Sequence, residues 1–176
     1  MARVSLIEED DHPELADLIA KIRSGRRGKL LNVYKILLHS PPLAATWFEH
    51  VSAVRWQTQL DGRLREMVII RVALLNRIEY VVRQHVPALA LAEGLSREEC
   101  DALADWETGR LFDARERAAL AYTDAITRAA DVSDSIFAEL RRHFSEREVV
   151  ELTVLIGTYI MHNRVFGALK IDLENA

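Results

Sequence analysis

The sequence predicts an all-α protein, a bundle of about eight or nine helices in one domain over residues 1–176. Three observations support this prediction. Helix-capping pairs recur along the chain, apolar residues repeat at helical spacing between them, and no segment alternates as a strand does. Of the 176 residues, 49% are hydrophobic and 28% charged, with only 7 glycines and 4 prolines, which is the composition of a helical globular protein.

Several helix starts are marked by Ser or Asp followed three residues later by Glu, a pair whose side chains bond the unpaired N–H groups of a first helical turn. Proline marks two further starts and glycine one end. The capping pairs are Ser96 and Glu99, Asp113 and Glu116, and Ser145 and Glu148; the prolines are Pro13 and Pro41-Pro42, and the glycine is Gly94. Helices are expected near 13–24, 29–39, 41–58, 62–75, 77–93, 97–105, 114–130, 134–143 and 146–168. Residues 1–58 would form an N-terminal extension and residues 59–176 the core.

A weak internal repeat relates two of these helices. Arg65-Glu66-Met67-Val68 and Arg147-Glu148-Val149-Val150 each precede a long apolar stretch. The match is consistent with a duplicated helical unit, and shared helix composition explains it equally well.

Charge and cysteine content exclude several classes of protein. The net charge is −4, and the basic cluster at 23–29 contains no aromatic residues, which argues against nucleic-acid binding. The single cysteine, Cys100, cannot form an internal disulfide and fits a reducing compartment, so a cytoplasmic protein is expected. No apolar run approaches transmembrane length. The histidines show no metal-binding spacing, and no dinucleotide or phosphate loop is present, so we expect neither metal nor cofactor.

Two polar residues interrupt apolar helix faces. Glu66 shares a stripe with Ile69, Ile70 and Ala73, and a buried carboxylate there would suit acid/base chemistry or could simply be held by an arginine. His85 lies on the stripe that begins at Ile78. Pro87 should interrupt the helix beside His85 and leave room for a ligand, although a core histidine bonded to a backbone carbonyl is the simpler reading.

Further polar residues are candidate ligand contacts. Tyr80 and Gln84 lie one turn apart on a neighbouring face and could offer a phenol and an amide. Arg71, within the most apolar run, requires a carboxylate partner on another helix or subunit, or else an anionic ligand. Near the C-terminus, Tyr159, His162, Asn163 and Arg164 stand on an otherwise apolar helix; Arg164 is a candidate anion-binding residue, although a salt bridge is its simpler use.

Three segments together resemble the core of the carboxymuconolactone decarboxylase and AhpD-like superfamily. They are Leu64-Arg65-Glu66, Arg71-Val72-Ala73 and Glu79-Tyr80…Gln84-His85-Val86-Pro87. The segments around Tyr34 to Leu43 and around Phe144 to Gly157 are similar to flanking helices of its decarboxylase-like members. In the peroxidase branch a Cys-x-x-Cys motif precedes the histidine, whereas this chain has Ile78 and Val81 at those positions. Without a thiolate, peroxidase activity is excluded.

The resemblance implies a cofactor-free decarboxylase acting on a carboxylated lactone or another ring-cleavage acid. His85 would be the acid/base, Glu66 its relay partner and Tyr80 a hydrogen-bond donor, with Gln84 and either Arg71 or Arg164 binding the substrate. A related isomerase or hydrolase, or a non-catalytic binding or assembly protein, would use the same cleft. The resemblance also implies a homo-oligomer, a trimer or hexamer. Trp47, Phe48 and Trp56 would suit its contacts, although they could equally belong to the core.

Overall fold

The computed structural model describes residues 2–129 and 131–174, and every regular element within these ranges is helical, as the sequence predicts. The α-helices are α1 (Ala16–Ser24), α2 (Asn32–Leu37), α3 (Pro41–Trp56), α4 (Gly62–Asn76), α5 (Glu79–His85), α6 (Arg97–Ala102), α7 (Ala114–Ala129), α8 (Asp134–His143) and α9 (Glu146–Leu169). Short 3-10 turns occur at Glu9–Asp11, Pro13–Leu15 and Leu103–Asp105. None of the helices in the described ranges is long and apolar enough to cross a membrane.

The predicted capping pairs are confirmed. At the start of α6, Ser96 Oγ accepts from the N–H of Glu99, and the Glu99 carboxylate accepts from the N–H of Ser96. The same reciprocal bonds join Asp113 to Glu116 before α7, and Ser145 to Glu148 before α9. These bonds satisfy donors that have no partner within the helix, so the sequence sets where the helices begin.

The chain forms two compact units, residues 1–57 with 165–176 and residues 58–164, and α9 contributes to both. In the first unit α3 packs against α1 and α2. Phe48 lies in its core, edge to face with Tyr34 at 6.1 Å between ring centroids, whereas Trp56 is exposed. A single domain over residues 1–176 and a homo-oligomeric assembly remain predictions.

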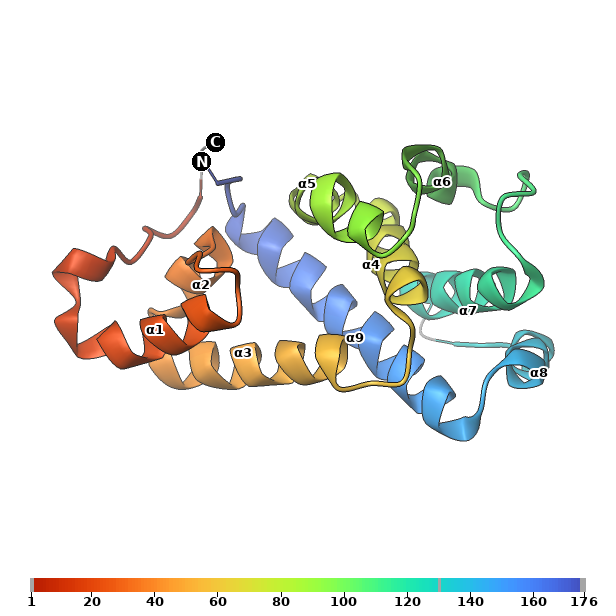
Figure 1. Cartoon of the computed structure of the whole chain (residues 1–176), viewed down its shortest axis with the longest axis horizontal. Coiled ribbons are helices and arrows are strands. Elements are labelled where there is room, and N and C mark those ends of the chain that lie inside the picture. The colour runs from red at the N-terminus through yellow and green to blue at the C-terminus, as the bar shows by residue number, and fades with distance from the viewer. Residues whose placement is uncertain (1, 130, 175–176) are drawn as a thin grey trace. The chain divides into compact units, whose positions relative to one another are not determined.

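The second unit is built around α4, which packs against α5 and α7, while α8 packs against α7 (Figure 1). Every residue from Leu64 to Ala73 is buried, so α4 has no solvent-facing side over that length. A helix enclosed in this way is a core helix, and each polar side chain on it needs a partner. The core includes Met67, Ile70, Val86, Ala90, Leu95, Cys100, Leu103, Trp106, Phe112 and Leu120.

A tight turn joins α4 to α5 and determines which of their residues meet. Arg77 ends α4 in the left-handed conformation with φ of 57°, and the N–H of Ile78 donates to the carbonyl of Ala73 at 3.0 Å. The chain then reverses, so that Glu66 comes to face His85. The interruption expected at Pro87 takes the form of a π-helical turn, Val86–Ala90, directly after His85. A widened turn accommodates a residue that lacks an N–H donor.

Candidate active site

The centre of the candidate site is the contact between Glu66 and His85. Glu66 is 0% exposed on α4, and its Oε2 lies 2.6 Å from Nδ1 of His85, which is buried at the end of α5. The Asp61 side chain caps α4 by accepting from the N–H of Leu64, which fixes where the helix starts. The structure thus brings together the two residues that the sequence singled out as polar interruptions of apolar faces.

Arg65 ties this carboxylate to a second one. Its Nε lies 3.6 Å from Oε1 of Glu66, and its Nη2 donates to Glu93 at 2.7 Å. A Cβ at position 62 would overlap the Glu93 carboxylate, so Gly62 allows Glu93 to approach the start of α4. Because a nearby guanidinium favours the charged form of a carboxyl group, Arg65 supports an ionised Glu66.

An ionised Glu66 determines which nitrogen of His85 can exchange a proton with a substrate. A carboxylate only accepts hydrogen bonds, so when Glu66 is ionised Nδ1 of His85 carries the proton in their contact. In the neutral ring Nε2 then has the lone pair, and in the imidazolium it has the mobile proton. A carboxylate that orients a histidine in this way makes it a competent general acid or base.

Aromatic side chains of α9 line the pair. The ring of Tyr159 meets His85 edge to face at 5.7 Å between centroids, and His162 stacks on Tyr159 at 5.0 Å. Nδ1 of His162 donates to the carbonyl of Thr158 at 2.7 Å, because a carbonyl oxygen can only accept. In the sequence Tyr159 and His162 are polar residues on an apolar helix, but the contact of Tyr159 with His85 was not predicted.

Arg71 has the inter-helix partner that the sequence left open as one alternative. It binds Asp124 of α7 through two bonds, from Nε at 2.6 Å and from Nη2 at 2.5 Å. Its Nη1 donates to the carbonyls of Leu103 and Ala104. A substrate carboxylate could reach this guanidinium only by displacing Asp124.

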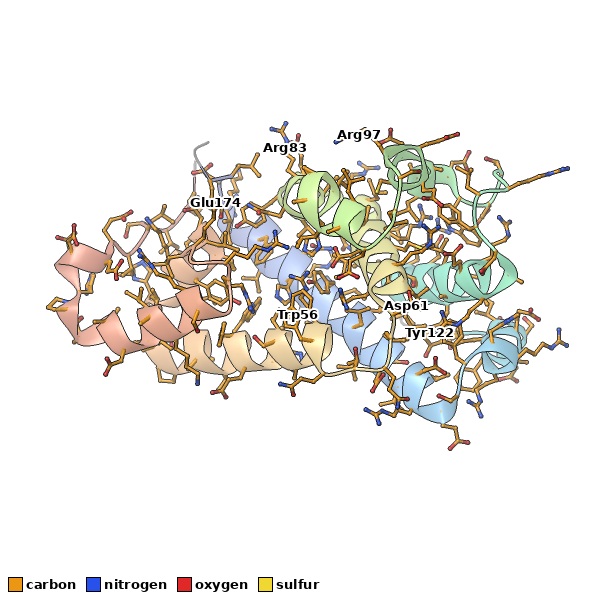
Figure 2. All side chains as sticks on the ribbon, viewed as in Figure 1. Trp56, Asp61, Arg83, Arg97, Tyr122 and Glu174 are labelled. Atoms are coloured by element: carbon orange, nitrogen blue, oxygen red, sulfur yellow. The ribbon has the colours of Figure 1, made fainter. Side chains whose placement is uncertain are left out.

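The other candidate ligand contacts differ in how far they are buried. Tyr80 is buried and Gln84 is half-buried on α5. Tyr80 precedes His85 by five residues, which on a helix places them about 140° apart. Arg164 is exposed on α9. Arg83 is also exposed; it pairs with Glu79 at 2.5 Å and points outward (Figure 2).

One of the two positions of the missing thiols lines an apolar hollow. Ile78 contributes to a pocket of about 260 Å³ at the turn between α4 and α5, lined by Ala73, Leu74, Arg77, Ile78, Glu79 and Val82. Cys100 cannot replace a reactive thiol, because it lies in the core of the unit, where burial raises the pKa of its thiol. Among the described residues no three His, Cys, Asp or Glu side chains are grouped to hold a metal ion.

Comparison with known proteins supports this architecture. The model of the carboxymuconolactone decarboxylase family matches residues 41–125. The uncharacterized protein YnjA of Escherichia coli is 32% identical over 122 residues, which are 68% of this chain and 66% of YnjA. A solved protein of unknown function from Agrobacterium tumefaciens, suggested to be an antioxidant defence protein AhpD, is 26% identical with a TM-score of 0.75, over 80% of this chain and 97% of that one.

The fold extends to more distant proteins. The debrominase Bmp8, solved in complex with 2,3,4-tribromopyrrole, has a TM-score of 0.82 over 99% of this chain and 94% of its own, but only 20% identity, which shows the fold alone. Fold and site together define an all-helical bundle with a buried carboxylate–imidazole pair. The chain belongs to the carboxymuconolactone decarboxylase family and is similar to AhpD-like proteins.

Proposed function

We propose that the protein is an acid/base enzyme that decarboxylates a carboxylated lactone or a related ring-cleavage acid without a cofactor. The observation that carries the proposal is the 2.6 Å contact between buried Glu66 and His85 in a chain that has no cysteine at positions 78 and 81. The proton-transfer residues of the family are retained, whereas its redox residues are not. Decarboxylation suits such a site, because it redistributes electrons within the substrate and needs no external oxidant.

In the proposed reaction His85 donates the proton and Glu66 stabilises the charged imidazole. The bond between the substrate carboxylate and the ring breaks, carbon dioxide leaves, and the electron pair enters the conjugated carbonyl as a dienolate. His85, as the imidazolium, donates its Nε2 proton to a carbon of the dienolate and later regains a proton from water. Glu66 stabilises the imidazolium through the Nδ1 hydrogen bond. Tyr80 would donate to the dienolate oxygen, and Gln84 and Arg164 would bind the polar end of the substrate.

Carbon dioxide release from carboxymuconolactone tests the proposal. We expect His85→Gln to lower turnover about 10²–10⁴-fold, the usual contribution of a general acid or base. His143→Gln is the matched control, because His143 bonds only Glu139 of its own helix among the described residues and should leave turnover unchanged. Full activity of His85→Gln would remove His85 from the mechanism.

Product analysis separates the related functions. A different product from the same acid would identify an isomerase or hydrolase that uses the same pair. Stabilisation of the protein by the acid without any turnover would identify a binding protein. Either outcome would contradict decarboxylation while keeping the site.

A further inference from the structure

Asn163 of α9 is a buried amide whose hydrogen-bonding groups are not used. The residue is 1% exposed, and neither its Nδ2 nor its Oδ1 has a hydrogen-bond partner among residues 2–129 and 131–174. Buried polar groups are nearly always hydrogen-bonded, because losing water without gaining a partner costs free energy. The Asn163 amide therefore needs a hydrogen-bond partner that the described residues do not supply.

Other polar side chains of the same unit show that a helix can satisfy such a group by itself. Asn76 of α4 donates from Nδ2 to the carbonyl of Val72, four residues earlier, at 2.8 Å. On α9, Thr158 and His162 make the equivalent bonds to carbonyls four residues back. Asn163 does not make this bond, so its own helix does not satisfy its amide.

The position of Asn163 connects it to the candidate site. It follows Tyr159 by four residues and therefore shares its face of α9. Tyr159 is the residue whose ring contacts His85, and His162, stacked on Tyr159, is the neighbour of Asn163 in the chain. The unsatisfied amide thus lies about one helical turn from the ring that contacts the proton-transfer pair.

We propose that Asn163 binds the ligand of the Glu66–His85 site and recognises a group with a carbonyl oxygen beside an N–H or O–H. The Nδ2 group donates to the carbonyl oxygen, and Oδ1 accepts from the neighbouring donor, so both amide atoms are satisfied at once. Carboxamides, lactams, protonated carboxylic acids and hydroxy-carbonyl groups fit this pattern. An ionised carboxylate fits less well, because it only accepts and leaves Oδ1 without a partner.

The inference rests on the proposed function only in placing the ligand beside the pair, and it does not depend on which reaction the pair performs. A planar ring attached to the recognised group would lie near the aromatic side chains of Tyr159 and His162. Benzamide is therefore a suitable probe, and benzoate is its matched partner, since it has the same ring but offers acceptors alone.

The experiment combines binding with thermal unfolding of the full chain. We expect the parent to bind benzamide with a Kd of about 1 mM, as a small ligand can, and benzoate roughly tenfold more weakly. Asn163→Leu should weaken benzamide binding at least about tenfold and abolish the preference over benzoate. The same variant should raise Tm by about 2–4 °C, because an unsatisfied buried amide is replaced by an apolar side chain of similar size.

Asn76→Leu is the matched control, because the same substitution there removes a hydrogen bond that the structure contains. It should leave benzamide binding unchanged and should not raise Tm. Asn163→Ala serves as a second binding variant if leucine does not fit, and it too should lose affinity for benzamide.

The outcomes separate this inference from the proposed function. It is overturned if the parent does not bind benzamide, if it binds benzoate equally well, or if the Asn163 variants bind benzamide normally. It is also overturned if Asn163→Leu lowers Tm more than Asn76→Leu does, because the amide would then be satisfied by internal water. If His85→Gln keeps full turnover while these binding results hold, the proposed function fails and the role of Asn163 stands.

Discussion

Two buried side-chain pairs join α4 to neighbouring helices, and they differ in their chemistry. Arg71 and Asp124 lock α4 to α7, and Asp124 is also contacted by Trp106 and Arg128. Glu66 and His85 lock α4 to α5 at a similarly short distance. A guanidinium keeps its protons at all ordinary pH values, whereas an imidazole exchanges its protons near neutrality.

Burial and short distance do not by themselves identify a reactive pair. Both pairs are buried in the same unit, and the sequence presents Arg71 and Glu66 alike, as charged residues in an apolar helix. What separates them is the chemistry of the partner. Arg71 and Asp124 hold α4 against α7, whereas in the proposed function Glu66 and His85 pass a proton to a third molecule.

The largest expected effect is on turnover. In the assay of carbon dioxide release, Glu66→Gln and His85→Gln should each lower turnover about 10²–10⁴-fold. The double variant should be no slower than the slower single variant, because residues that act as a unit lose their contribution together. Losses that multiply in the double variant would show that Glu66 and His85 act independently, which would contradict their role as a pair.

The second expected effect is a loss of stability when the Arg71–Asp124 pair is broken. Arg71→Met leaves Asp124 buried without its main partner and should destabilise the protein by about 3–5 kcal/mol, seen as a Tm lower by about 10 °C. Arg71→Met with Asp124→Leu should recover most of that loss, because no buried charge remains. A change in Tm of Arg71→Met below about 2 °C would contradict the structural role.

A gain-of-function variant tests whether the missing cysteines account for the absence of thiol chemistry beside His85. Ile78 and Val81 stand three residues apart at the start of α5, a position that favours a reactive thiolate and lies on the same helix as His85. The double variant Ile78→Cys/Val81→Cys should gain thiol-dependent reduction of a hydroperoxide, which the parent lacks. Ile78→Cys alone is the control, since it has no resolving thiol. Equal peroxide reduction by the parent would overturn its exclusion from thiol chemistry.

The smallest expected effect concerns a pair nearer the surface. Hydrogen bonding from Arg63 lowers the pKa of Glu99 from 4.5 to about 2, so this pair adds stability above pH 4.5 that is lost as the pH falls toward 2. Between pH 5 and pH 3 the parent should lose about 2–4 °C of Tm more than Glu99→Gln, after allowance for solvent screening. Glutamine keeps the capping bond, and Glu98→Gln is the exposed control. Identical pH dependence of parent and Glu99→Gln would show that the pair contributes nothing.

Local signals in the sequence predicted much of the fold. The capping pairs located three helix starts because those interactions join residues three apart. Glu66 and His85 stood out because each interrupts an apolar face, and the structure brings them together. The partner of Arg71 could not be predicted, since Asp124 is 53 residues away and meets it only through the packing of α7 on α4. The contact of Tyr159 with His85 depends on packing in the same way, as does the lack of a partner for the Asn163 amide.

The protonation of His85 itself, observed by NMR of protein with ¹⁵N-labelled histidine, tests whether Glu66 and His85 form a proton-transfer pair. The His85 signals are assigned by their loss in His85→Gln. If Glu66 is the ionised partner, neutral His85 carries its proton on Nδ1 and has a lone pair on Nε2. A neutral ring with its proton on Nε2 and none on Nδ1 would contradict the account, because His85 could not then donate to Glu66.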